Sequence, residues 1–412
     1  MRASLAGIRI VDLTMGWAGP LATRNLADMG ADVIKVESCE RFDWWRSWEA
    51  TPQWIADDGA EKSNQFNMVN RNKRAITLDL EHPEGRRLLL ELVATANAVV
   101  ENYSGGVLPK LKLSYEVFRE VRPDIVLLSM PAFGSTGPWR MFRAYGSTVE
   151  QSSGLPHLHG HPEDLPTMVH VAYGDPVGGL NGAAALLTAL RHQRRTGQGQ
   201  FVDLSQVESL FPLAAHGILE FSATGVAPPR LANRSRSFAP HGVYPCAATP
   251  ECPDAWLVLQ VQTEAQWRSL VALIPGLDEF GGVDDRLSRQ QALDAAIARW
   301  SQTRSSRSLM LELQTRGIPA AATNAMRDLI GEPQLEARGY WQWLDRAVVG
   351  NQPNPSPPYR LGAEPIPVRT PAPTLGQHNG EVLGGLLGLS GVELERLEAE
   401  GVIGTRPRMP SR

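Results

Sequence analysis

Short apolar runs alternate with helix-like segments through the first 204 residues, and this alternation constrains the fold more than any other feature. Six runs predict buried strands: Gly7–Thr14, Asp32–Glu37, Ile76–Leu80, Ala98–Asn102, Asp124–Ser129 and Gly199–Leu204. Segments between and after them have helical periodicity: Ala18–Met29, His82–Thr95, Tyr115–Val121, Leu180–Leu190 and Val207–Thr224. Strands that alternate with helices at this spacing favour parallel βαβ units. The sequence therefore predicts an α/β fold with a doubly wound parallel sheet.

The chain of 412 residues is long enough for more than one domain. A Pro/Arg/Ser-rich stretch over 225–240 predicts a linker, and Val243–Val261 predicts paired strands followed by helices. The proline-rich segment Gly350–Pro373 predicts an extended path, and Leu383–Glu400 a helical pair. We expect a large domain over 1–224, a linker and smaller α+β domain over 225–330, and an extended return with C-terminal helices over 331–412 that joins the large domain.

Charge and cysteine content limit the partners and the compartment. The formal net charge of −4 argues against nucleic acid as a bulk partner, since that role usually needs a basic surface. No apolar run approaches the ~18 residues of a membrane span, and the N-terminus lacks the form of a signal peptide. Three cysteines, Cys39, Cys246 and Cys252, cannot form a disulfide framework. We expect a cytoplasmic protein.

The sequence predicts neither a dinucleotide-binding loop nor a metal site. The residues after the first strand, Thr14–Pro20, lack the Gly-x-Gly-x-x-Gly spacing of a dinucleotide-binding loop. Three histidines at alternate positions could share one face of a strand and bind a metal: His157, His159 and His161. Their glycine and proline flanks favour a flexible loop, so we predict no metal site.

Several motifs follow one another in a fixed order along nearly the whole chain. They are Leu5–Thr14, Ala18–Pro20, Leu26–Glu37, Asn72–Leu80, Pro83–Arg86, Val100–Tyr103, Phe133–Pro138, Ser153–Gly154, Asp175, Thr196–Gln200, Gly317–Pro319 and Leu375–Asn379. In order and spacing the set resembles the family III CoA-transferases, the group of formyl-CoA transferase, carnitine CoA-transferase and α-methylacyl-CoA racemase. The resemblance implies a large doubly wound domain formed by both chain ends, a smaller domain, and an interlocked homodimer. It also implies acyl-CoA and carboxylic acid substrates, with coenzyme A as a substrate and no permanently bound cofactor.

Asp175 aligns with the catalytic aspartate of that family, which carries an acyl group and then CoA. Locally, Asp is a preferred helix N-cap and Pro176 a preferred first helical residue, so a plain capping role explains the residue equally well. We expect the N-cap position to lower the pKa of Asp175, and nearby backbone N–H groups to stabilise an oxyanion. Gly178 and Gly179 are expected to leave room for an approaching thioester.

The resemblance also assigns binding residues. It places CoA against Gly16, Trp17, Ala18, Lys73, Arg74, Asn102, Tyr103 and Lys110, whose basic members suit phosphates. It places Phe133 and Tyr145 near the acyl group. From the residues themselves, the linker side chains Arg234, Arg236 and His241 could face an acceptor carboxylate or be ordinary surface charges. Tryptophans of the long excursion after the second strand could stack on a ligand or serve as buried anchors: Trp44, Trp45 and Trp54.

Departures from the family pattern leave alternatives open. Ser38 stands where several members have Arg, and Phe133 where formyl-CoA transferase has Tyr; without a four-glycine loop, an oxalate/formyl enzyme is not expected. A racemase would need a histidine base where Tyr145 stands, and tyrosine titrates near ~10. A non-catalytic CoA-binding subunit is a third reading, against which the presence of Asp175 argues.

Overall fold

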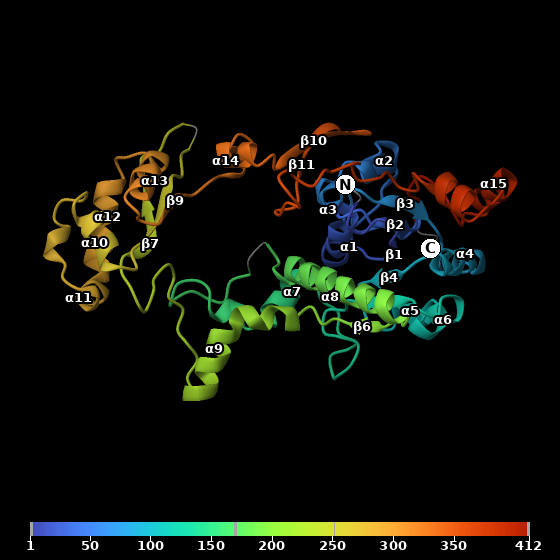
Figure 1. Cartoon of the computed structure of the whole chain (residues 1–412), viewed down its shortest axis with the longest axis horizontal. Helices are drawn as coiled ribbons and strands as arrows, with labels where there is room; N and C mark the ends of the chain where they lie inside the picture. Colours follow the sequence, from blue (N-terminus) through green and yellow to red (C-terminus); the bar gives the residue numbers. More distant parts are fainter. Residues whose placement is uncertain (1–2, 169–170, 251, 410–412) are drawn as a thin grey trace. The chain divides into compact units, whose positions relative to one another are not determined.

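The computed structural model describes residues 3–168, 171–250 and 252–409. They form two compact units, which Figure 1 shows coloured along the sequence. The first unit holds the chain up to Pro156, Met168–Val226, and everything from Gln334 onward. The second holds His157–Thr167 and Ala227–Pro333. Both ends of the chain therefore belong to the first unit.

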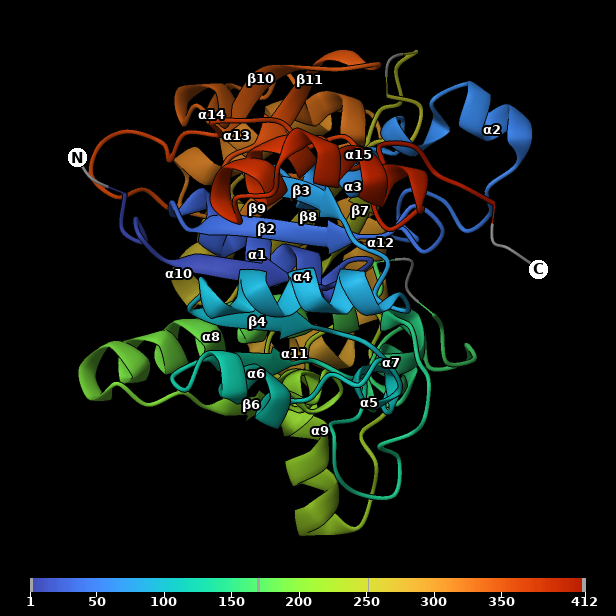
Figure 2. The same ribbon diagram turned by 90° about the vertical axis from the view of Figure 1, so that its right-hand side faces the viewer.

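The first unit is built on a six-stranded sheet in which all strands run parallel, as the sequence predicted. Its strands are β1 (Arg9–Asp12), β2 (Asp32–Glu37), β3 (Arg74–Thr77), β4 (Ala98–Glu101), β5 (Val126–Ser129) and β6 (Phe201–Asp203). Their order is β3-β2-β1-β4-β5-β6, and Figure 2 follows the sheet from β3 through β2 and β4 to β6. The order reverses between β1 and β4, and the crevice at such a switch point is where α/β sheets bind ligands.

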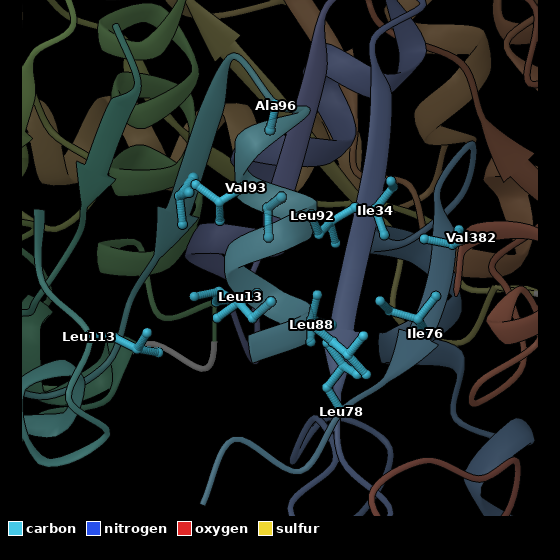
Figure 3. Packing of buried hydrophobic residues seen from close by; sticks show 14 of the residues in the cluster. Leu13, Ile34, Ile76, Leu78, Leu88, Leu92, Val93, Ala96, Leu113 and Val382 are labelled. Atoms are coloured by element: carbon cyan, nitrogen blue, oxygen red, sulfur yellow. The ribbon is translucent and has the colours of Figure 1, made fainter. Parts of the chain in front are cut away.

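Helices cover both faces of this sheet because side chains alternate along each strand. Ile10 and Val33 point to the face covered by α1 (Ala18–Asp28) and α8 (Gly174–Thr196). Their neighbours point to the other face, covered by α4 (Pro83–Ala94), α6 (Tyr115–Val121), the π-helix Gly380–Leu386 and α15 (Gly391–Ala399). Figure 3 shows Ile34 and Ile76 of the sheet against Leu88 and Leu92 of α4, with Val382 from near the C-terminus. The sheet is thus buried on both sides.

Apart from helix α9 (Phe211–Thr224), the remaining elements of the first unit are short. They are α2 (Pro52–Ala56), α3 (Asn64–Val69), α5 (Val107–Lys110), α7 (Gly146–Gln151), the 3-10 turns Gly59–Glu61, Leu155–His157 and Glu208–Leu210, and the antiparallel pair β10 (Trp341–Arg346) and β11 (Gly350–Pro355). Helix α14 (Pro333–Ala337) begins at the boundary between the units. None of the helices in the described ranges is long and apolar enough to cross a membrane.

The second unit has its own core. Its antiparallel sheet contains β7 (His241–Pro245), β8 (Trp256–Gln260) and β9 (Ala320–Ala322), which confirms the predicted strand pair. Leu257 and Leu259 of β8 pack with Leu293, Ile297 and Leu309. Leu293 and Ile297 come from α12 (Gln290–Ser301), and Leu309 comes from α13 (Ser306–Thr315). The other helices and turns of this unit are α10 (Glu264–Val271), Leu277–Glu279, α11 (Val283–Ser288) and Met326–Leu329. The helices predicted to follow the strand pair are present, and three of them, α11, α12 and α13, follow one another from Val283 to Thr315.

Candidate active site

Asp175 lies inside the first turn of α8. The helix begins at Gly174, and its N-cap is Tyr173. The expectation that Asp175 is the N-cap is therefore wrong: the Gly-Asp-Pro segment belongs to the helix. The Asp175 carboxylate accepts hydrogen bonds from the backbone N–H groups of Ala18 and Gly146, which are the first residues of α1 and α7. Three helix N-termini thus meet at this carboxylate.

The predicted direction of its pKa shift is also wrong. Burial raises the pKa of Asp175 to about 6, although the bonds from Ala18 and Gly146 pull it down. The cost of removing the charge from water exceeds the gain from the two donors. At pH 7 the carboxylate is still ionised in roughly nine molecules of ten, so it is available as a nucleophile.

Gly146 makes the close approach of this carboxylate possible. A Cβ atom at position 146 would overlap Asp175 Oδ2. Gly178 and Gly179 allow close packing: a Cβ at 179 would lie 2.6 Å from the Ala18 carbonyl oxygen, and one at 178 would contact Gln206. The small size of Gly179 therefore lets α8 pack against α1, and room for an approaching thioester stays a prediction.

A cavity of about 470 Å³ opens beside Asp175. Its lining combines predicted residues with others: Met15, Trp44, Asn102, Tyr103, Ser104, Val107, Ala132, Phe142, Arg143, Ala144, Tyr145, Gly146, Thr148, Val149, Asp175 and Gln206. The fold therefore brings Asn102, Tyr103 and Tyr145 together with Asp175. All of these residues belong to the first unit.

Asn102 fixes the loop that carries Ala18. Its Oδ1 accepts from the Met15 N–H at 2.8 Å, and its Nδ2 donates to the Met15 carbonyl at 2.8 Å. These bonds join the carboxyl ends of β1 and β4 at the switch point. In the same loop, the Gly16 N–H donates to Asp43 Oδ1 at 2.8 Å, and Gly16 has a φ of +73°. The side chain of Trp17 packs 5.4 Å from the ring of Trp45.

The two basic residues before β3 are occupied by protein contacts. Lys73 is buried, and its Nζ donates to Asp12 Oδ2 at 2.9 Å, the Pro20 carbonyl at 3.0 Å and Asn70 Oδ1 at 2.8 Å. An ammonium has three protons, so all are used and none faces a phosphate. Arg74 pairs with Asp32 and Glu381. Lys110 lies exposed at the end of α5.

Aromatic rings surround one side of the cavity. Trp44 stacks on Trp48 with ring centroids 4.5 Å apart, and Tyr145 stands edge-on to both at 5.8 and 5.4 Å. Trp48 and Tyr145 are 65% and 58% exposed, so they present apolar surface near the nucleophile. Phe133 packs against Trp139 and Phe142 and does not line the cavity itself.

The remaining predicted residues belong to the second unit. Arg234 Nη2 lies 3.5 Å from Asp294 Oδ2, and His241 Nδ1 lies 2.6 Å from the Asn233 carbonyl oxygen. Both line a cavity of about 590 Å³ within that unit, and Arg236 is exposed nearby in the sequence. Within the described ranges, no three His, Cys, Asp or Glu side chains are arranged to hold a metal ion.

Sequence reasoning missed several residues of the site, among them Phe142, Arg143 and Gly146. Phe142 and Arg143 come from the segment between β5 and α7, which has neither strand nor helix periodicity, and Gly146 is the first residue of α7. Trp44, which lines the cavity, was predicted only as a residue that stacks on a ligand or anchors the long excursion.

Comparisons with known proteins agree with one another. A family described as CoA-transferase family III matches residues 5–379. The chain is 32% identical over 404 residues to the succinate–glutarate CoA-transferase of Agrobacterium fabrum, with 96% of each chain covered. It is 31% identical over 415 residues to the succinyl-CoA:glutarate CoA-transferase of Mus musculus, covering 97% of this chain and 90% of the relative. A CAIB/BAIF family protein from Brucella suis has a similar structure, with a TM-score of 0.82, 30% identity, and coverage of 94% of this chain and 100% of the other.

Proposed function

Because the chain belongs to CoA-transferase family III and is a CoA-transferase, we propose that Asp175 serves as its covalent nucleophile. The reaction moves coenzyme A from an acyl-CoA thioester to a carboxylic acid. One observation carries the proposal: the Asp175 carboxylate sits beside a cavity and is bound by the N–H groups of Ala18 and Gly146.

Each proposed step exchanges one acyl bond for another. An Asp175 oxygen attacks the thioester carbon, the C–S bond breaks, and a mixed anhydride and CoA thiolate form. The thiolate attacks the Asp175 carbonyl carbon and releases the donor acid as a carboxylate, leaving an aspartyl-CoA thioester. The acceptor carboxylate then attacks that carbon and expels CoA thiolate. The thiolate finally attacks the acceptor's acyl carbon, which gives the new acyl-CoA and restores the Asp175 carboxylate.

The surroundings of Asp175 support these steps. Each tetrahedral intermediate at its carbonyl carbon carries a negative oxygen, and the N–H groups of Ala18 and Gly146 are already aimed at that position. Burial leaves the ionised carboxylate poorly solvated, and this makes it more reactive as a nucleophile.

For coenzyme A, we propose that the thioester end lies along the loop of Gly16, Trp17 and Ala18 and the segment of Asn102 and Tyr103. Their common position at the switch point supports this placement. Lys110 is the predicted cation best suited to a phosphate, since Lys73 and Arg74 would first have to give up ion pairs with Asp12 and Asp32.

Epimerisation of an acyl-CoA is the second candidate function. The pKa of Asp175, raised to about 6, favours it because a general base works best near the operating pH. Such an enzyme also needs a partner acid on the opposite side of the substrate carbon, and the cavity beside Asp175 contains the hydroxyl-bearing side chains of Tyr103 and Tyr145. Exchange of the substrate α-proton with deuterium, without transfer, would identify this activity.

We further propose the interlocked homodimer that the resemblance implies. Helix α9 supports it, because five of its large apolar side chains are at least 39% exposed: Phe211, Leu213, Ile218, Leu219 and Phe221. An exposed apolar face of this kind usually marks an interaction surface.

Asp175→Ala tests the proposed function. The names of the relatives make succinyl-CoA with glutarate the first pair to try. We expect new thioesters by mass spectrometry with the wild type and a loss of at least ~10³-fold in rate with Asp175→Ala. Asp278→Ala, at an exposed aspartate of the second unit, is the control. Full transfer by Asp175→Ala would contradict the proposal.

A further inference from the structure

The loop between β1 and α1 brings the Ala18 N–H to Asp175, and a side chain outside the cavity lining holds this loop. Gly16, two residues before Ala18, donates its N–H to Asp43 Oδ1 at 2.8 Å. The same oxygen accepts from the Trp45 N–H at 2.9 Å. One carboxylate oxygen of Asp43 therefore joins the loop to the long segment that follows β2.

Asp43 is itself fixed by residues of β2. Its Oδ2 lies 2.9 Å from Lys35 Nζ, and both side chains are fully buried. Its N–H donates to Glu37 Oε1 at 2.9 Å. Lys35 Nζ also donates to the Thr14 carbonyl oxygen at 2.7 Å, at the start of the same loop. A buried carboxylate is stable only while its charge is paired and its oxygens are bonded, so these contacts restrict where Asp43 can lie.

The loop has little room to move once Asp43 is in place. Gly16 has a φ of +73°, and a Cβ atom there would overlap the ring of Trp44. Asn102 holds the preceding residue, Met15, from β4. Only Trp17 separates Gly16 from Ala18, so a shift of Gly16 passes directly to the N–H that Asp175 accepts.

We propose that Asp43 is a positioning residue of the reaction, which holds the loop so that the Ala18 N–H stays aimed at the Asp175 carboxylate and at the oxyanion formed there. This inference rests on the proposed function of Asp175. Asp43 is fully buried, so it acts through Gly16 and does not touch a substrate. The alternative is a purely structural anchor, which would change only the amount of folded protein.

Asp43→Ala removes the acceptor of the Gly16 N–H, and kcat per active site separates the two roles. Transfer from succinyl-CoA to glutarate is measured, and active sites are counted as the fraction of Asp175 that succinyl-CoA and hydroxylamine convert to the hydroxamate. This count removes the effect of unfolded protein. We expect kcat per site to fall by about 10²-fold, because a displaced oxyanion donor acts much like an absent one. Hydrogen–deuterium exchange of the peptide with Gly16 and Ala18 should become faster.

Asp43→Asn is the conservative variant. Its amide oxygen can still accept from the Gly16 N–H, but it lacks the charge that strengthens this bond. We expect kcat per site to fall by only about fivefold and exchange at Gly16 to be intermediate.

Asp28→Ala is the matched control. Asp28 is also buried, lies 2.8 Å from Arg71 in an ion pair, and stands at the opposite end of α1 from Ala18. Both alanine variants break a buried ion pair, so both should lower the melting temperature. In Asp28→Ala, kcat per site and exchange at Gly16 should stay within about twofold of wild type.

Several results would overturn the inference. If Asp43→Ala keeps the wild-type kcat per site while wild type forms the Asp175 hydroxamate, the positioning role is excluded and the proposed function stands. An equal loss of kcat per site in Asp28→Ala would also exclude it. If Asp43→Ala does not fold, wild-type kcat and exchange in Asp43→Asn would do the same. If wild type makes new thioesters and never the hydroxamate, the proposed function itself fails, whatever the exchange at Gly16.

Discussion

At the residue scale, the burial of Asp175 has a measurable effect on stability. Its pKa is raised from 3.8 to about 6, so the folded state binds more protons than the unfolded state between about pH 4 and 6. The contribution of this residue to stability therefore falls as pH rises through that window. Above it, the full cost of burying the ionised carboxylate lowers the free energy of unfolding.

Asp175→Asn should consequently stabilise the protein at pH 7.5 and have little effect at pH 4. We expect the free energy of unfolding to rise by about 1–2 kcal/mol at the higher pH, since the buried charge is removed while an acceptor oxygen is kept. Urea denaturation at both pH values measures it. A loss of stability at pH 7.5 would mean that the carboxylate is held by favourable charge interactions instead.

Gly146→Ala should misplace the nucleophile without unfolding the chain. The added Cβ would overlap Asp175 Oδ2, and displacement of a reacting group by about 1 Å can cost about 10²-fold in rate. Transfer rate, the pH profile of the reaction and the melting temperature should be compared. Gly391→Ala is a matched control, because Gly391 also opens a helix, α15, and a Cβ there meets nothing within 4 Å. If the transfer rate of Gly146→Ala stayed within a few-fold of wild type, the close contact between Gly146 and Asp175 would not be needed to position the nucleophile.

At the element scale, Lys73 connects one strand, one helix and one turn of the first unit. Its bonds to Asp12, the Pro20 carbonyl and Asn70 join the end of β1, the start of α1 and the turn before β3. Lys73→Met would leave the buried Asp12 carboxylate without this partner. We expect the free energy of unfolding to fall by about 3 kcal/mol and the melting temperature to fall with it.

Lys110→Met provides the contrast. Lys110 is exposed at the end of α5, so its removal should change stability by no more than about 0.5 kcal/mol. If it meets a CoA phosphate, the KM for acyl-CoA should rise and become less dependent on salt. A Lys73→Met variant with an unchanged Tm and a raised KM would return the phosphate-binding role to Lys73.

The elements also show where sequence reasoning succeeds. Strand β2 was predicted with its observed bounds, Asp32–Glu37, because its β-branched residues Val33, Ile34 and Val36 favour a strand. Helix α8 was predicted to begin too late, since glycine and proline at 174–179 resemble a loop, although Gly179 lies within the helix and packs against α1. The pair β10–β11 was missed because the prolines of Gly350–Pro355 disfavour strands, and an edge pair tolerates them.

The site was predictable only in part for a similar reason. Asn102 and Tyr103 follow a recognisable strand, so their place at the switch point could be expected. Gly146 opens α7 after a segment without regular structure, so only the folded chain shows that it meets Asp175.

At the scale of the whole molecule, the first unit joins both chain ends around one sheet, whereas the second unit has a separate core. The proposed homodimer belongs to this scale. Sedimentation equilibrium should give the mass of two 45.0 kDa chains. Leu219→Asp, at a residue of α9 that is 67% exposed, should weaken that association. A wild-type monomer at micromolar concentration would contradict the proposal.

The central claim is that Asp175 becomes covalently attached to the substrate. The most direct measurement is to mix the enzyme with succinyl-CoA, quench with hydroxylamine, and identify the modified peptide by mass spectrometry. The account predicts a hydroxamate at Asp175, formed in wild type and absent from Asp175→Asn. A hydroxamate at another carboxylate, or none while new thioesters still form at full rate, would contradict it.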